Sequence, residues 1–238
     1  MIYAKAFFEL QLEFAGTVSA LSRLPLARTV LEYTNFYIRF GLGRDFDPIH
    51  PRWQEYLAGL RDAQDRQEWT YRFYVIRRDP PPPGIVATFG CFSYAWLSSD
   101  RIRLHFQPAE RDGLSPLAKE RCDRRLGDLA ALFASLKHSS RKPIRVVGAS
   151  WLYNLPAYRR LFPESYLAIA HVVQHRFRHM PLWGQFVNRY GEVRENMARE
   201  FRDRLRQQSS LQDLDRCFPF QVLSLEAPVV EFYDFYGV

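Results

Sequence analysis

A short polar segment at residues 107–116, Gln-Pro-Ala-Glu-Arg-Asp-Gly-Leu-Ser-Pro, has residue types that suit the binding of a phosphate group. The pair Ser115-Pro116 is typical of a helix start, with serine as the N-cap and proline at the first helical position. A helix start presents unpaired backbone N–H groups and the positive end of the helix dipole. Gly113 lets the backbone approach an anion closely, and Arg111 could add a charge-assisted hydrogen bond. The segment predicts an anion-binding loop; the alternative is an ordinary capped loop in which Gly113 serves a turn.

Two other groups of chemically capable residues are weaker candidates. His171, His175 and His179 are spaced by four, which on a helix could chelate zinc. Their surroundings predict a strand, however, on which side chains four apart lie about 13 Å from each other, too far for one metal. Ser150 follows a predicted strand, but the run Gly-Ala-Ser-Trp-Leu at 148–152 lacks the second glycine of a hydrolase nucleophile turn. The three cysteines are far apart and form no zinc pattern. We therefore expect no metal and no serine hydrolase.

The secondary structure predicted around these residues changes along the chain, from helices at the N-terminus to strands. Amphipathic spacing predicts helices at 4–22, 26–40 and 51–61, and aromatic and β-branched residues predict strands at 69–77, 85–97 and 101–107. The proline run at 79–84 is expected to be a rigid connector loop.

The second half of the chain alternates between the two types of element. We expect a helix from 115 to about 137, a strand at 142–150, a short helix at 155–161, a strand at 166–174, a long helix at 181–206 and a strand at 221–232. An antiparallel meander joined to right-handed crossovers predicts an α+β (mixed α/β) fold with a mixed sheet. We divide the chain into an N-terminal helical segment at 1–65 and a core at 66–238, together forming one compact domain, with the long helix inserted before the last strand.

This order of elements resembles that of the GCN5-related N-acetyltransferase superfamily, whose members are acyl-CoA transferases. The family has two leading helices, a three-strand meander and a strand-to-helix loop that binds the coenzyme A pyrophosphate. The resemblance covers about residues 66–238 in topology and about 105–166 in residues. It implies that the loop at 111–115 binds the cofactor, through Arg111, Asp112, Gly113, Leu114 and Ser115. The family pattern is Gln/Arg-x-x-Gly-x-Gly/Ala; the spacing here differs, and Ser115 takes the second small position.

A second stretch, Asn154-Leu-Pro-Ala-Tyr-Arg-Arg-Leu-Phe162, is similar to the family's Asn-x-x-Ala followed by tyrosine and Gly-Phe, with the glycine deleted. The resemblance implies that Asn154 contributes to cofactor binding and that Tyr158 donates a proton to the leaving thiolate. A phenol with an ordinary pKa near 10 suits that role. The alternative is that Tyr158 and Phe162, one helical turn apart, simply cover the core.

Acyl transfer to an amine also needs a base. His105 lies on the polar face of the third predicted meander strand, next to the proposed loop, and its ordinary pKa lies near neutral pH. Glu110 is the other candidate. A histidine on a strand is more often simply exposed or hydrogen-bonded.

The amino-acid composition indicates the class of protein and does not indicate an activity. The chain has 238 residues, of which 47% are hydrophobic and 25% charged, which is typical of a globular protein. We expect no signal peptide, no membrane span and a reducing cytoplasm as its location.

The net charge of +7 is concentrated in one segment. Residues 101–180 hold 15 Lys/Arg and 6 Asp/Glu, whereas the rest of the chain holds 18 and 20. This segment predicts an anionic partner. Two functions remain open: an acyltransferase that uses acyl-CoA as cosubstrate, with an unknown amine or hydroxyl acceptor, and a non-catalytic protein whose basic face binds nucleic acid or an acidic partner.

Overall fold

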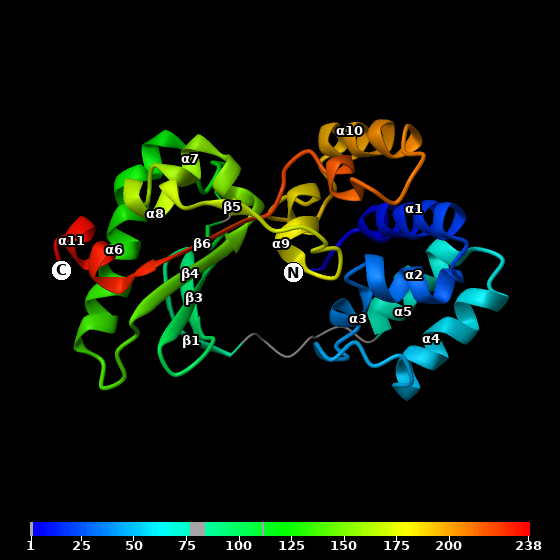
Figure 1. Ribbon diagram of the computed structural model, residues 1–238, viewed down its shortest axis with the longest axis horizontal. Coiled ribbons are helices and arrows are strands. Elements are labelled where there is room, and N and C mark those ends of the chain that lie inside the picture. The colour runs from blue at the N-terminus through cyan, green and yellow to red at the C-terminus, as the bar shows by residue number, and fades with distance from the viewer. Residues whose placement is uncertain (1, 77–83, 111) are drawn as a thin grey trace. The chain divides into compact units, whose positions relative to one another are not determined.

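The computed structural model describes residues 2–76, 84–110 and 112–238. The chain divides into two compact units, shown in Figure 1. The helical unit comprises Met1–Pro82 and Gln174–Gln221, and the sheet unit comprises Pro83–Val173 and Val222–Val238. This division differs from the expected boundary at residue 65, because the segment 174–221 belongs with the N-terminal helices. The connector predicted at 79–84 lies outside the described residues, apart from Gly84.

A mixed sheet forms the centre of the sheet unit. Its strands are β1 (Ile85–Phe89), β2 (Phe92–Trp96), β3 (Arg101–Phe106), β4 (Arg145–Ser150), β5 (His171–Val172) and β6 (Leu223–Pro228). Within the described residues these strands make one sheet in the order β1-β2-β3-β4-β6-β5. The β3–β4 pair is parallel, and the other neighbours are antiparallel. The predicted α+β class with a mixed sheet is confirmed.

Helices cover one face of this sheet. They are α6 (Cys122–His138), α7 (Pro156–Arg159), α8 (Glu164–Ala168) and α11 (Val229–Tyr236), with the 3-10 turns η1 (Lys119–Arg121) and η2 (Trp151–Asn154). Alternate residues of the strands, such as Ile102 and Val146, share a buried core with Phe133 of α6 and Phe232 of α11. Arg101, Arg103 and His105 alternate with these core residues and belong to the other face.

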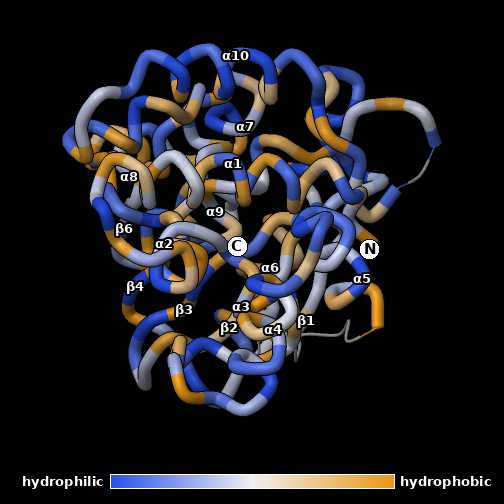
Figure 2. The backbone as a smooth tube through the Cα atoms, turned by 90° about the vertical axis from the view of Figure 1, so that its right-hand side faces the viewer, coloured by the Kyte–Doolittle hydropathy of each residue, from blue (hydrophilic) through white to orange (hydrophobic). Residues whose placement is uncertain are grey.

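The helical unit packs around aromatic side chains. Its elements are α1 (Lys5–Ser22), α2 (Leu26–Tyr33), α3 (Phe36–Arg39), α4 (Pro51–Asp62), α5 (Arg66–Ile76), α9 (Met180–Trp183), η3 (Gly184–Phe186), α10 (Glu195–Arg206) and η4 (Leu214–Cys217). The Phe14 ring of α1 lies within 6 Å of the rings of Phe177, Trp183, Phe201 and Phe218. These contacts explain why 174–221 joins the N-terminal helices. Figure 2 shows α10 as largely hydrophilic, and its Arg202 pairs with Glu13 at 2.8 Å.

The strand predicted at 69–77 is wrong: its described part belongs to α5. The Asp65 carboxylate accepts hydrogen bonds from the backbone N–H groups of Gln67 and Glu68, both at 2.9 Å, and so caps a helix start. Thr70, Phe73 and Tyr74 are buried at the i, i+3, i+4 spacing of one helix face. The cap and the packing outweigh the strand propensity of the aromatic and β-branched residues.

The strand predicted at 85–97 is a hairpin of β1 and β2. Gly90 forms its turn with a φ of 55°, in the left-handed region that favours glycine. A Cβ at Gly90 would overlap the Asp128 carboxylate of α6. The three-strand meander is thus present, but β1 and β2 occupy what was predicted as one strand.

Three further predicted elements are shorter than expected. The helix at 26–40 breaks at residues 34 and 35, and the strand at 166–174 is reduced to β5 because Pro163 and Glu164 start α8. The long helix at 181–206 becomes α9, η3 and α10, separated by a turn at Gly191, whose φ is 85°.

Candidate functional site

The parallel ladder between β3 and β4 ends halfway along both strands. Arg101, Ile102 and Arg103 pair with residues 145–147, and the ladder stops there. Beyond that point the ladder of 104–106 continues with β2, and that of 148–150 continues with β6. The Ser224 hydroxyl donates a hydrogen bond to the Gly148 carbonyl oxygen at 3.4 Å. An extended ligand that carries amide groups of its own could pair with strands that separate in this way.

Tyrosines occupy the core side of the same position. The ring of Tyr158 lies 5.5 Å from that of Phe106, the last residue of β3. The Tyr158 hydroxyl hydrogen-bonds to that of Tyr153, which in turn lies 2.9 Å from the Tyr166 hydroxyl. A Cβ at Gly148 of β4 would overlap the hydroxyls of Tyr153 and Tyr166. The three phenols thus form one cluster against the end of the β3–β4 ladder.

The pKa expected for Tyr158 needs correction. The side chain is only 3% exposed, and burial raises its pKa well above 10, with Tyr153 adding to the effect. The prediction of a phenol with an ordinary pKa near 10 is therefore wrong for this buried state. Tyr158 remains protonated across the physiological range, so it is a hydrogen-bond donor more readily than a source of protons.

The loop that leads from β3 to α6 is tied down by a buried ionic cluster. Glu110, whose side chain is 11% exposed, pairs with Arg125 and, at 3.1 Å, with Arg121. Arg125 is 1% exposed and also donates to the Pro116 carbonyl oxygen at 3.2 Å. The Cys91 thiol donates to Glu110 at 3.3 Å. The loop is therefore anchored at both ends by α6.

Glu110 has the properties of a structural anion. Burial raises its pKa, but hydrogen bonds from Arg125 and Cys91 outweigh this and lower the pKa to about 2. A carboxylate with such a pKa binds protons poorly near neutral pH. This argues against Glu110 as the base and leaves His105 as the candidate.

The helix start predicted at Ser115-Pro116 is wrong. Lys119–Arg121 form a 3-10 turn, and α6 begins at Cys122. The Ser115 hydroxyl instead accepts a hydrogen bond from the backbone N–H of Leu117 at 3.3 Å, in a local turn. The positive end of the helix dipole therefore lies at the start of α6, several residues after the helix start predicted from the sequence.

The individual loop residues differ in what they offer a ligand. Gly113 has a φ of 68°, and a Cβ there would meet no atom within 4 Å. Asp112 pairs with Arg121, and Leu114 is exposed. Arg111 lies outside the described residues. A side chain at Gly113 would therefore occupy open space, and binding of an anion there stays a prediction.

Arg160, at the C-terminal end of α7, reaches the loop. Its Nη2 donates to the carbonyl oxygens of Leu117 and Ala118 at 2.9 and 3.0 Å. The stretch 154–162 is thereby connected to the residues that directly follow 107–116.

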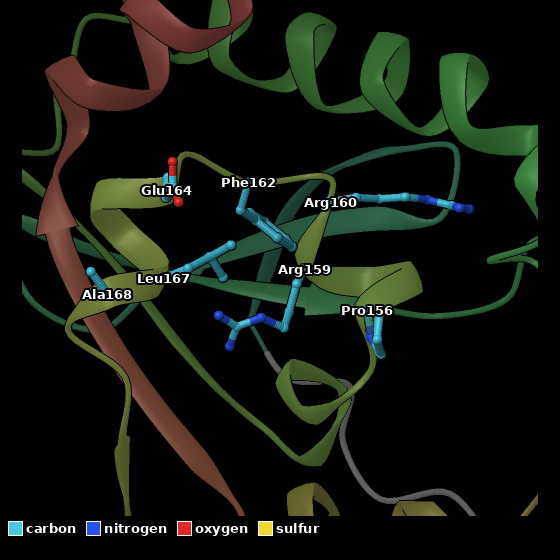
Figure 3. A pocket seen from close by; sticks show the side chains of 7 residues that line it. All are labelled: Pro156, Arg159, Arg160, Phe162, Glu164, Leu167 and Ala168. Carbon is cyan, nitrogen blue, oxygen red and sulfur yellow. The ribbon is translucent and has the colours of Figure 1, made fainter.

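An open pocket of about 490 Å³ lies beside this connection. It is lined by Pro156, Arg159, Arg160, Phe162, Glu164, Leu167 and Ala168, shown in Figure 3. Its lining combines apolar side chains with the charged Arg159, Arg160 and Glu164, and in Figure 3 the Arg160 side chain extends away from the others, towards its carbonyl partners. Arg159 is therefore the cation available to a negatively charged ligand in this pocket. Arg159 and Arg160 were not among the residues predicted for a site; the signal for them in the sequence is a pair of adjacent arginines in a segment of net positive charge.

The remaining predicted residues lie apart from this pocket. His105 is opposite Ser93 in the β2–β3 ladder, on the sheet face opposite Phe106 and Tyr158. The Asn154 amide donates to the Trp151 carbonyl oxygen at 2.8 Å, within its own turn. The structure thus separates the candidate base from Tyr158 by the thickness of the sheet, near the point where the β3–β4 ladder ends.

Four basic residues of 101–180 lie around the loop: Arg121, Arg124 and Arg125 pair with Glu110, and Arg160 binds the carbonyl oxygens of Leu117 and Ala118. Other basic residues of the segment have partners elsewhere, among them Arg101 and Arg145 with Glu226, Arg141 with the carbonyl oxygens of Ser98 and Ser99, and Lys137 with that of Val238. The positive charge of the segment is therefore distributed over several places, of which the loop is one.

The described residues contain no group of three or more His, Cys, Asp or Glu side chains arranged to hold a metal ion. In the same part of the chain, no helix is both long and apolar enough to cross a membrane. Comparisons with protein-family models, with curated proteins and with solved structures find no match to the chain.

Proposed function

We propose that the chain is an acyltransferase that moves an acyl group from acyl-CoA to an amine or hydroxyl acceptor. The observation that carries the proposal is the end of the parallel β3–β4 ladder beside Tyr158. Pantetheine is a narrow chain with two amide groups, so it could pair with the inner edges at 104–106 and 148–150 as a further strand would.

The order of strands supports the same proposal. A meander of β1, β2 and β3, a crossover through α6 to a parallel β4, and two closing strands agree with the topology expected from the resemblance to the GCN5-related superfamily. Fold alone does not establish activity, so the proposal depends on the site.

The phosphate groups of coenzyme A would bind beside the loop at 111–115 and the pocket next to α7. The backbone around Gly113 would approach the pyrophosphate, and Arg160 would hold the carbonyl end of the loop in place. The pocket beside α7 would take the adenosine end, with Arg159 near its phosphate. This assignment predicts that removing the 3′-phosphate, as in dephospho-CoA, weakens binding.

Acyl-CoA would supply the acyl group as a thioester. His105 would accept the proton of the attacking amine or hydroxyl, from its own face of the sheet. Tyr158 would donate a hydrogen bond to the leaving sulfur from the other face. The two roles fall on opposite faces because His105 and Phe106 are neighbours on β3.

The second function considered, a basic surface for nucleic acid or an acidic partner, requires an open stripe of free cations. The ion pairs of Arg121, Arg125 and Arg145 work against this arrangement. The test that decides between the two is calorimetric titration with coenzyme A, acetyl-CoA and dephospho-CoA, beside a titration with a short RNA.

A further inference from the structure

The strand β1 lies at one edge of the sheet. Within the described residues, β2 is its only neighbour in the sheet. We propose that the outer edge of β1 pairs antiparallel with β1 of a second copy of this chain, so that the two sheets join across a two-fold axis. The inference goes beyond acyl transfer and does not depend on it.

The two edges of the sheet differ in how they are protected from pairing. The edge strand β5 has two residues, and a very short edge strand offers little backbone to another chain. By contrast, β1 has five residues, Ile-Val-Ala-Thr-Phe, none of which is charged. Val86 is 51% exposed, and Thr88 is exposed too. An uncharged, exposed edge strand is a template for pairing with a further strand.

The hairpin determines which backbone groups of β1 point outward. Phe89 pairs with Phe92 across the two-residue turn of Gly90 and Cys91. The residues that flank such a turn exchange hydrogen bonds, and the next pair along the ladder does not. The backbone N–H and C=O groups of Thr88 therefore point away from β2. Placed opposite Thr88 of the second copy, they would exchange two hydrogen bonds and bring two threonine side chains together, which is a favourable cross-strand pair.

This ladder between the two copies is short. A bulge between Ile85 and Ala87 limits the regular part of β1 to residues 87–89, and a pair centred on Thr88 uses this part. Two short strands alone are marginally stable in water, and a stable interface usually buries about 1,000 Å² or more. The dimer therefore needs a second contact beside the strands.

The helix α6 is placed to supply that contact. It packs on β1 and β2, on the core face of the sheet. Neighbouring strands lie about 4.8 Å apart, so an axis midway between β1 and its copy runs about 5 Å to the side of a helix seated over β1 and β2. The two copies of α6 would then lie antiparallel and about 10 Å apart, which is within the usual range for packed helices.

The flank of α6 on the side of β1 carries small side chains. The Asp128 carboxylate lies against Gly90, at the turn between β1 and β2, whereas the opposite flank packs on α11. Ala131 and Ser135 follow Asp128 on its flank at the i+3 and i+7 positions, and both are exposed. Asp128 pairs with Arg125, so its charge would not be buried alone. A second copy would cover this flank together with the edge of β1, whereas a bound peptide strand would leave the flank exposed.

Sedimentation velocity of the full chain between about 1 and 200 µM measures the oligomeric state. We expect a reversible equilibrium between monomer and dimer, with a dissociation constant in the micromolar range. Thr88→Pro removes an outward N–H group and no β1–β2 hydrogen bond, so it should weaken the dimer by at least about tenfold.

Two exposed substitutions keep the test decisive if the proline variant does not fold. Val86→Lys adds a charge to the edge of β1, and Ala131→Arg adds a long, charged side chain to the flank of α6; each should also weaken the dimer by at least about tenfold. Val230→Lys is the matched control, because Val230 is 53% exposed but lies on α11. It should leave the dissociation constant unchanged.

A cysteine at position 88 tests the register of the proposed pair. Thr88→Cys would place two thiols across the axis with about 5.5 Å between their Cα atoms, which a disulfide can span. Under mild oxidation this variant should form a covalent dimer. Wild type and Val230→Cys, which contain the same three native cysteines, should stay without the cross-link.

Two results would overturn the inference. If wild type is monomeric up to about 200 µM, the edge of β1 does not bind a second copy. If wild type dimerises but Val86→Lys and Ala131→Arg dimerise as tightly, or Thr88→Cys forms no more cross-link than Val230→Cys, the dimer uses another surface and the proposed pairing is wrong.

Discussion

The guanidinium of Arg160 donates a hydrogen bond to the carbonyl oxygen of Ala118 at 3.0 Å and so connects α7 to the loop before α6. The same nitrogen donates to the Leu117 carbonyl oxygen at 2.9 Å. The residue after α7 thus holds the segment that directly follows 107–116. This segment is stabilised by a side chain more than forty positions away in sequence.

Replacing Arg160 with glutamine should weaken coenzyme A binding by about tenfold, or about 1.4 kcal/mol, because the loop loses its anchor and the pocket loses a cation. Unfolding free energy should change by less than about 1 kcal/mol, since Arg160 is exposed. Calorimetry and urea denaturation measure the two effects. Arg199→Gln, the same change on exposed α10, should leave affinity unaltered; equal affinity of the two variants would contradict the role given to Arg160.

Gly113→Val should abolish measurable coenzyme A binding while the protein stays folded. A Cβ at Gly113 meets no protein atom within 4 Å, so the valine would occupy space that the ligand needs. Its φ of 68° adds a backbone strain of about 1–2 kcal/mol.

Gly43→Val is the matched control for that strain. Gly43 has a φ of 97° and equally open surroundings, but it belongs to the helical unit. It should cost similar stability and leave coenzyme A affinity intact. Full binding by Gly113→Val would remove the loop from the site.

Gly148→Ala should lower the free energy of unfolding by about 1–3 kcal/mol, because its Cβ would overlap the hydroxyls of Tyr153 and Tyr166. Urea denaturation measures the loss. Gly127→Ala in α6 makes the same substitution where a Cβ meets no atom within 4 Å, and it should be neutral or stabilising by up to about 1 kcal/mol. An unchanged stability for Gly148→Ala would mean that the tyrosines do not pack against β4 as described.

Glu110→Gln should destabilise the protein by about 1.5–3 kcal/mol near neutral pH, because the buried Arg125 and Arg121 each lose a charge-assisted hydrogen bond. Arg125 keeps its ion pair with Asp128, and Arg121 keeps its ion pair with Asp112. The folded pKa of Glu110, about 2, lies below the ordinary value of 4.5. Its stabilising contribution is therefore fully present above about pH 4.5 and is lost as pH falls towards 2.

The difference in stability between wild type and Glu110→Gln should accordingly shrink between near-neutral pH and about pH 3, as measured by urea denaturation at each pH. Glu120→Gln neutralises an exposed carboxylate nearby and should change stability by less than about 0.5 kcal/mol. A difference that stays constant down to about pH 3 would show that the ion pair does not hold the loop.

Local patterns in the sequence predicted some elements correctly, such as α1, α4, β3 and β4, and gave the wrong structure at others. Arg101–Phe106 alternates strictly between apolar and polar residues, and that pattern correctly gave β3. The run at 69–77 has equally strong strand propensity, yet α5 forms there because Asp65 caps it and Phe73 packs at helical spacing. Strand propensity does not decide the structure where a helix cap and tertiary packing both favour a helix.

The candidate site was only partly visible in the sequence for a similar reason. Gly113 carries its own signal, since a glycine in a polar loop predicts a positive φ. Ser115-Pro116 wrongly predicted a helix start: residues 115–118 form a turn, and the carbonyl oxygens of Pro116 and Leu117 accept hydrogen bonds from Arg125 and Arg160. The burial of Tyr158 and the low pKa of Glu110 arise from distant partners, which spacing along the chain does not reveal.

The most direct test of the account is calorimetric titration of the protein with coenzyme A and acetyl-CoA, with thermal unfolding measured alongside. The account predicts dissociation constants in the micromolar range and weaker binding of dephospho-CoA. Saturation at about a hundred times the dissociation constant should add about 2.7 kcal/mol of stability. No heat and no thermal shift with coenzyme A, acetyl-CoA or a longer acyl-CoA would contradict the proposed acyltransferase.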